Sequence, residues 1–142
     1  MKVEELMTRD PATLHPESTC TEAATLMKTR DCGSLPVVQD GKLIGIVTDR
    51  DIVIRAVAGG TDPTHLAVSE VMTKAPVSVA PDLKAEDAAK VMSERQVRRL
   101  PVVDNGRLVG MLVIGQLARH ESADAAGETL KDVSRPAAKT KP

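Results

Sequence analysis

The feature that most constrains this chain is a β-hairpin pattern that occurs twice. Residues 35–47 form two apolar runs around Asp40-Gly41, and residues 100–112 form two such runs around Asn105-Gly106. Asp, Asn and Gly tolerate positive φ, which both central residues of a two-residue type I′ turn require. Each pattern therefore predicts an antiparallel hairpin.

The repeat extends beyond the hairpins. Residues 3–52 match residues 68–117 without a gap, at a constant spacing of 65 residues. Two copies of this length indicate a duplicated module rather than a solenoid. We expect a first repeat at residues 1–58, a linker at 59–67, a second repeat at 68–120 and a partly disordered tail at 121–142, with a short helix around 127–134.

Local patterns predict a β-α-β-β-α order in each repeat. Thr19 and Glu22 fit a capping box that begins a helix ending near Gly33. The expected helices and helical turns are 2–8, 19–33, 49–58, 68–73, 84–95 and one starting at 117; the expected extended pieces outside the hairpins are 12–15 and 77–79. The predicted fold class is α/β (α+β): two pseudo-symmetric units, each a small sheet backed by helices, form one compact module around a pseudo-two-fold axis.

Composition excludes several classes of function. The chain has no aromatic residue, so bases have no aromatic side chain to stack on, and its net charge of −1 leaves no basic footprint for nucleic acid. It contains no long apolar span and no N-terminal signal pattern, which argues against membrane insertion or secretion. Cys20 and Cys32 form no CxxC motif, and reduced thiols in a cytoplasmic protein are the simplest interpretation.

Three repeated motifs resemble the cystathionine β-synthase (CBS) domain. They are Met-Thr-x-x-Pro at residues 7–11 and 72–76, the two Leu-Pro-Val-Val runs, and Gly45-Ile-Val-Thr-x-x-Asp51. The tandem arrangement resembles a CBS pair, or Bateman module, and the whole chain resembles small stand-alone bacterial CBS-pair proteins, including hypoxia-response types. The resemblance implies an adenosine-containing ligand in the cleft between the repeats, with AMP, ADP, ATP or S-adenosylmethionine as candidates, and no required cofactor.

Thr48-x-x-Asp51 is the sharpest local signal, and it has two interpretations. A threonine three residues before an acid, ahead of an apolar run, is a helix capping box. The family resemblance instead implies that this hydroxyl and this carboxylate hold a ribose diol, and the two roles are compatible. In the second repeat the matching residues are Val113 and Gln116, so we expect at most one competent ribose site per chain.

The resemblance implies the rest of the site residue by residue. The backbone of Val97 and Arg98, with Ala75 and Pro76, would hold the purine edge, and Ile46 would pack on the base. Arg50, Arg98 or Arg99 would supply a cation for phosphate, although Arg98 and Arg99 are equally explained as a solvated pair beside the hairpin. Gly33 and Ser34 occupy the matching places in the first repeat, where phosphate could approach the backbone.

Enzyme activity is not expected. No nucleophile, P-loop or zinc-protease motif is present, and Asp49 and Asp51 are better explained at a helix start than as an acid pair or Mg²⁺ site. His15, His65 and His120 have no metal-ligand spacing, so no metal is predicted.

The leading hypothesis is a non-enzymatic regulatory sensor that signals energy or stress state to a protein partner. The short apolar helix at 49–58 must be buried against the other repeat or another chain, which fits the homodimers that CBS pairs commonly form. The alternative is a ligand-free structural or stress-response homodimer.

Overall fold

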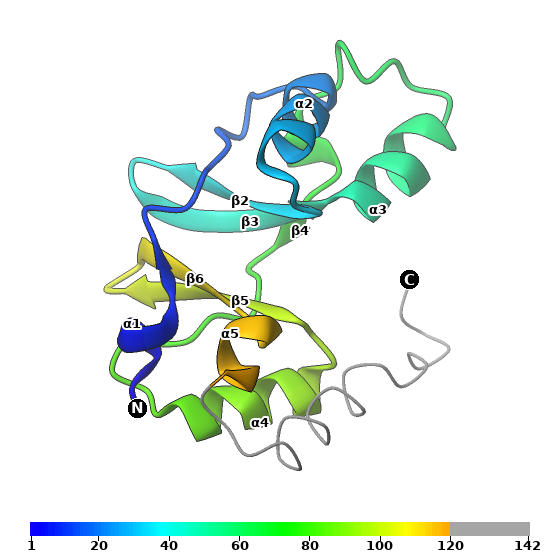
Figure 1. Ribbon diagram of the computed structural model, residues 1–142. Coiled ribbons are helices and arrows are strands. Elements are labelled where there is room, and N and C mark those ends of the chain that lie inside the picture. Colours follow the sequence, from blue (N-terminus) through cyan, green and yellow to red (C-terminus); the bar gives the residue numbers. More distant parts are fainter. Residues whose placement is uncertain (120–142) are drawn as a thin grey trace. The chain divides into compact units, whose positions relative to one another are not determined.

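The computed structural model describes residues 1–119 (Figure 1). In chain order the elements are α1 (Val3–Leu6), β1 (Thr8–Arg9), α2 (Cys20–Arg30), β2 (Ser34–Gln39), β3 (Lys42–Thr48), α3 (Asp49–Asp51), the π-helix η1 (Ile52–Val57), the 3₁₀ turn η2 (Val68–Glu70), β4 (Thr73–Lys74), α4 (Ala85–Arg95), β5 (Arg99–Asp104), β6 (Arg107–Val113) and α5 (Ile114–Ala118). The strands pair antiparallel and are combined with helices, so the α+β class is confirmed. The predicted tail at 121–142, including the helix around 127–134, lies outside the described residues.

The chain divides into two compact units. Within residues 1–119, the first-repeat unit comprises Ala12–Pro76 with Gly106–Leu108, and the second-repeat unit comprises Met1–Pro11, Val77–Asn105 and residues 109–119. These boundaries differ from those of the sequence repeats, because the short helix and strand that begin each repeat pack with the other repeat. The first-repeat unit is therefore almost continuous in sequence, whereas the second-repeat unit requires the distant N-terminal segment.

In the first-repeat unit, β3 pairs with β2 on one side and with β4 on the other, both antiparallel. Helix α2 lies over this sheet (Figure 1). Small and aliphatic side chains fill the space between them, as expected for a core without aromatic residues. The core residues are Leu14, Cys20, Ala23, Met27, Leu35, Val37, Val47, Ile52, Ala56, Val68, Val71 and Met72.

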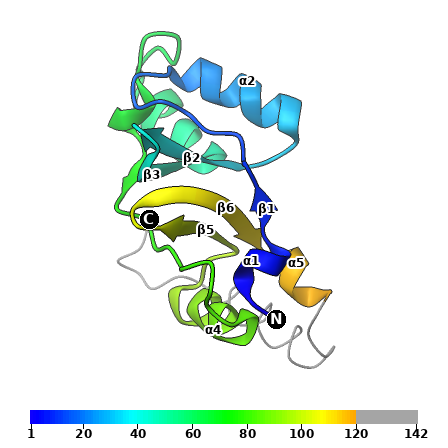
Figure 2. The same cartoon turned by 90° about the vertical axis from the view of Figure 1, so that its left-hand side faces the viewer.

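The second-repeat unit has the same construction with the N-terminal segment added. Strand β6 pairs with β1, with Thr8 opposite Met111, and with β5. Figure 2 shows α1 and β1 beside α5 and β6. The core contains Val3, Leu6 and Met7 of the N-terminal segment, together with side chains of α4, β5, β6 and α5.

Each unit contains a segment from outside its own sequence repeat, residues 66–76 in the first-repeat unit and residues 1–11 in the second-repeat unit, and we call these the exchanged segments. Equivalent backbone hydrogen bonds hold them in both units. The N–H of Cys20, at the start of α2, donates to the carbonyl of Leu66 at 2.8 Å, and that of Ala85, at the start of α4, donates to Met1 at 2.8 Å. The first N–H groups of a helix have no partner within the helix. The exchanged segments therefore satisfy groups that α2 and α4 leave open.

Both predicted hairpin turns are confirmed. Asp40 and Gly41 have φ of 54° and 79°, and Asn105 and Gly106 have φ of 53° and 82°. These are the left-handed conformations that a type I′ turn requires of both central residues.

Several helix boundaries differ from the sequence prediction. The helical turns expected at 2–8 and 68–73 end at Leu6 and Glu70, and strands β1 and β4 begin at Thr8 and Thr73. Helix α2 ends at Arg30 rather than near Gly33, because Asp31 takes the left-handed conformation of a C-cap. Helix α5 begins at Ile114 rather than Leu117. The segment expected to form one helix over 49–58 consists of α3 followed by η1, whose N–H groups reach back five residues, as in the 2.8 Å bond from Ala58 to Val53.

The apolar side chains of η1 are divided between core and surface. Ile52 and Ala56 are buried, but Val53, Ile54 and Val57 are 54%, 50% and 59% exposed. The expected burial of this segment is therefore found for Ile52 and Ala56 but not, within the described residues, for Val53, Ile54 and Val57.

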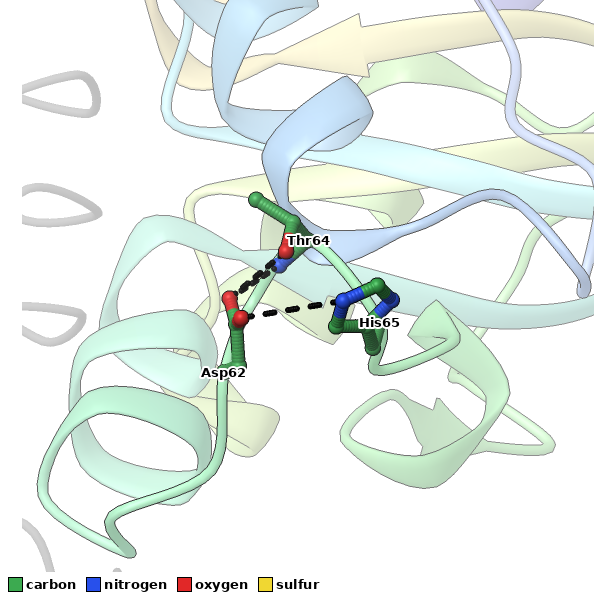
Figure 3. Close-up of polar contacts among 3 residues, drawn as sticks. All are labelled: Asp62, Thr64 and His65. Carbon is green, nitrogen blue, oxygen red and sulfur yellow. Dashed lines mark hydrogen bonds and ion pairs between the residues drawn. The ribbon is translucent and has the colours of Figure 1, made fainter.

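The linker forms a capped turn (Figure 3). Asp62 Oδ1 accepts the backbone N–H of Thr64 at 2.9 Å and its hydroxyl at 2.7 Å, and Asp62 Oδ2 lies 3.9 Å from His65 Nε2. The backbone and hydroxyl bonds from Thr64 lower the pKa of the Asp62 carboxyl, and the nearby His65 adds to this effect. The turn leads into residues that bond the start of α2, as in the 3.1 Å bond from Thr21 N–H to the carbonyl of Pro63.

Candidate functional site

The predicted capping box is present at the end of β3. The N–H of Asp51 donates to the Thr48 hydroxyl at 3.0 Å, and the N–H of Thr48 donates to Asp51 Oδ2 at 2.9 Å. Both side chains are half-buried. Each bond satisfies a backbone donor at the start of α3, so the structural interpretation of this pair is confirmed.

Ser34 lies directly opposite Thr48 across the β2–β3 ladder. It is 6% exposed, and its hydroxyl has no hydrogen-bond partner. A buried hydroxyl without a partner is costly, because it has lost water and gained nothing in return. Among the residues that the structure describes, Ser34 alone carries such a side-chain group.

Ala75 and Pro76 flank β3 on the side away from β2. Ile46 pairs with Thr73 of β4, and the N–H of Ala75 reaches the carbonyl of Ile44 at 3.4 Å. Ala75 has φ of 47°, a left-handed conformation that alanine rarely adopts. The structure thus brings Ala75, Pro76 and Ile46 into the same compact unit as Thr48 and Asp51, because β4 is an exchanged segment.

The space over Gly33 contains a carboxylate. The N–H of Asp49 donates to the carbonyl of Gly33 at 2.9 Å, and a Cβ added to Gly33 would lie 3.1 Å from Asp49 Oδ2. A phosphate approaching the Gly33 backbone, as the sequence suggested, would meet this like charge. Arg50 is exposed, and its N–H donates to Asp49 Oδ1 at 2.8 Å.

The corresponding place in the second-repeat unit has different chemistry. Val113 has no polar side chain, but its N–H donates to Gln116 Oε1 at 2.9 Å, and Gln116 Nε2 donates to the Thr8 hydroxyl at 2.9 Å. The loss of the carboxylate was predictable from the sequence, but this use of the amide was not, because Thr8 is 108 residues away from Gln116. Gln116 therefore joins α5 to β1.

The remaining predicted site residues, Val97, Arg98 and Arg99, belong to the second-repeat unit. Arg98 is exposed, whereas Val97 and Arg99 are half-buried. The carbonyl of Arg98 accepts the N–H of Ile114 at 2.9 Å, which repeats the Gly33–Asp49 bond of the other unit. The structure does not unite these three residues with Thr48 in one unit.

Other reactive side chains are dispersed. Within residues 1–119, no three His, Cys, Asp or Glu side chains are grouped to hold a metal ion. Cys20 is fully buried, and burial raises the pKa of its thiol, whereas Cys32 is half-buried. No helix in the same part of the chain is long and apolar enough to cross a membrane.

Comparisons with known proteins agree with this construction. The sequence profile of the CBS domain matches residues 3–57 and 68–123. The chain is 44% identical over 133 residues to the CBS domain-containing protein YhcV of Bacillus subtilis, covering 93% of this chain and 94% of YhcV. It is 37% identical over 121 residues to hypoxic response protein 1 of Mycobacterium tuberculosis, covering 84% of this chain and 85% of that protein.

Among solved structures, CBSX2 of Arabidopsis thaliana in complex with AMP has a TM-score of 0.74 and 30% identity, covering 84% of this chain and 94% of CBSX2. Both repeats match one family profile, and relatives above 30% identity align over nearly their whole lengths. CBS pairs of this kind are regulatory, non-catalytic modules. The chain belongs to the CBS domain family and is a CBS pair.

Proposed function

We propose that this CBS pair binds an adenosine-containing ligand at Ser34, Thr48 and Asp51 and passes the signal to a protein partner. The observation that carries the proposal is the buried Ser34 hydroxyl, which has no partner within residues 1–119. Native proteins satisfy nearly all buried polar groups, and an exception calls for an explanation such as an ordered water or a bound ligand. A ribose hydroxyl would supply the missing hydrogen bond.

Thr48 and Asp51 retain hydrogen-bonding capacity after forming the capping box. The box uses the Thr48 oxygen as an acceptor and only Oδ2 of Asp51. The Thr48 hydroxyl proton and Asp51 Oδ1 are chemically free to meet a diol, which needs both an acceptor and a donor. The AMP complex of CBSX2, a relative with 30% identity, supports an adenine nucleotide as the ligand.

The other proposed contacts follow from the family resemblance. Ile46, Ala75 and Pro76 would contact the base, with Val97 and Arg98 holding the purine edge. The proposed cations for phosphate are Arg50, Arg98 and Arg99. We place the protein in the cytoplasm, where such nucleotides are abundant, and expect one ligand per chain because Gln116 already bonds Thr8.

We further propose that the chain forms a homodimer through η1. Val53, Ile54 and Val57 expose apolar side chains on one short helix, and contiguous apolar surface of this kind is typical of interfaces. A second copy presents the same three side chains, so a two-fold contact would be self-complementary.

The second candidate function is a ligand-free structural or stress-response homodimer. It is favoured by the capping box, which gives Thr48 and Asp51 a complete structural role, and by their replacement with Val113 and Gln116 in the second repeat.

Isothermal titration of nucleotide-stripped protein with AMP, ADP, ATP and S-adenosylmethionine distinguishes the two functions. Saturable binding of one ligand per chain is the expected result, and the tightest ligand identifies the signal. No binding at millimolar concentration would refute the sensor and leave the structural dimer. Two ligands per chain would contradict the assignment of a single site.

A further inference from the structure

Arg55 of η1 reaches across to a separate segment of the first-repeat unit. Its Nη1 donates to the carbonyl of Val71 at 2.9 Å and lies 3.5 Å from that of Met72. A guanidinium donating to a carbonyl forms a charge-assisted bond, which is stronger than a neutral one. Arg55 thus fixes the backbone where η2 ends and the segment before β4 begins.

The segment that Arg55 holds is one wall of the candidate site. The Met72 side chain lies so close to β3 that a Cβ on Gly45 would overlap its Sδ, and Thr73 pairs with Ile46. Two residues later the chain reaches Ala75. We call residues 71–76 the wall segment. Met72 and Thr73 therefore contact β3 beside Ile46, two residues before Thr48.

Ala75 shows that the wall segment is held under strain. A non-glycine residue in the left-handed region is unfavourable, and it persists only where the surroundings fix it. On one side the wall segment is fixed by pairing with β3, and on the other by Arg55. Removal of the Arg55 bonds leaves the backbone carbonyls of Val71 and Met72 without this side-chain partner, while the pairing of β4 and the core packing of Val71 and Met72 remain.

The same helical segment connects the candidate site to the proposed dimer face. It begins at the Thr48–Asp51 box and continues through η1, where Val53, Ile54 and Val57 are exposed around Arg55. A π-helix is rare and commonly marks a functional position.

We propose that Arg55 is a positioning residue that holds the wall segment and thereby couples ligand binding to dimerisation. This inference rests on the proposed function. Binding at one site changes affinity at the other only if both bias the same element, and the coupling is then reciprocal. Here that element is η1 with the wall segment. In the second repeat the position that matches Arg55 is His120, so the arginine is present in the first repeat only.

The first test needs no ligand. Hydrogen exchange of the wall segment is compared in the wild type, Arg55→Ala and Arg55→Lys, with Arg30→Ala on α2 as the matched loss of a helix arginine. Exchange in Arg55→Ala is expected to rise about tenfold or more in the wall segment while α2 is unchanged. Arg55→Lys, which keeps a cationic donor, should restore part of the protection. Unchanged exchange in Arg55→Ala overturns the hold on the wall segment.

The second test measures the coupling. Dimer Kd is determined by sedimentation with and without saturating AMP. In the wild type and Arg30→Ala we expect AMP to change it about fivefold or more. In Arg55→Ala the dimer and AMP binding should persist while this factor falls to about one, and an unchanged factor overturns the coupling. If the wild type does not bind AMP, the proposed function and the coupling are both refuted. The hydrogen-exchange result then still decides whether Arg55 holds the wall segment.

Discussion

Ser34 and Thr48 are partners across the β2–β3 ladder, so their hydroxyl-bearing side chains project from the same face of the sheet. The Thr48 hydroxyl is used by the capping box, whereas the Ser34 hydroxyl is buried without a partner. The β2–β3 pair therefore carries the Thr48 hydroxyl, which accepts a protein hydrogen bond, and the Ser34 hydroxyl, which has none from the described residues.

Ser34→Ala should change stability and binding in opposite directions. Removal of an unsatisfied buried hydroxyl should leave the free energy of unfolding of the ligand-free protein unchanged or raise it by about 1 kcal/mol. AMP affinity should fall about fivefold or more, since a neutral hydrogen bond contributes about 1 kcal/mol. Urea unfolding and calorimetry measure the two effects, and equal affinity in both proteins would remove Ser34 from the site.

Asp51→Ala should weaken both the helix start and the ligand contact. Loss of the cap is expected to cost about 1 kcal/mol of unfolding free energy. Loss of a charged ribose contact should weaken AMP binding about ten- to a hundredfold.

Gln116→Ala is the matched control for Asp51→Ala. It removes the bond to the Val113 N–H, together with the bond to Thr8, and it should lower stability without changing AMP affinity. A similar loss of affinity in both variants would indicate a general effect of instability rather than a contact from Asp51.

Gly45→Ala and Gly115→Ala should have opposite effects on stability. A Cβ at Gly45 would overlap Met72 Sδ and lie 3.0 Å from the Thr73 carbonyl, whereas nothing lies within 4 Å of one at Gly115. Overpacking should cost about 1–3 kcal/mol at Gly45. Gly115 lies in α5, so its replacement by alanine should raise the free energy of unfolding by about 0.5–1 kcal/mol. Chemical denaturation checks both signs, and a Gly45→Ala protein as stable as the wild type would show that β4 can move away freely.

Ile54→Glu should separate the dimer without unfolding the chain. Ile54 is half exposed, so its replacement should change the unfolding free energy of the monomer by less than about 0.5 kcal/mol. A charge at the centre of an apolar contact should raise the dimer Kd about thirtyfold or more. Ala24→Glu, on the exposed face of α2, is the control. Sedimentation would contradict the proposed interface if both variants stayed dimeric.

Asp62 should make the linker turn sensitive to acid. Because its folded pKa lies below its ordinary value, the carboxylate stabilises the fold above the unfolded pKa of about 3.8, and this contribution is lost as pH falls through the folded pKa. Asp62→Ala should therefore lower Tm near neutral pH, and the difference from the wild type should shrink below about pH 4. A difference independent of pH would assign the effect to the turn backbone alone.

Local chemistry made part of this structure predictable. The turns at Asp40-Gly41 and Asn105-Gly106 depend on neighbouring residues only, as does the Thr48–Asp51 box. The π-helix was not predictable, because its apolar residues satisfy the pattern of an ordinary helix. The Gln116–Thr8 bond and the orphaned Ser34 hydroxyl depend on contacts between distant segments, and no local pattern encodes them.

The exchange of segments sets an order of assembly on the ribosome. Chains emerge N-terminus first, and the first-repeat unit can close once residues 12–76 are available, apart from the hairpin tip at 106–108. Met1–Pro11 emerges earlier, yet its partners in α4 and β6 are made after residues 12–76. Met1–Pro11 therefore cannot pack in its final place until the second repeat has been made, and its docking completes the second-repeat unit.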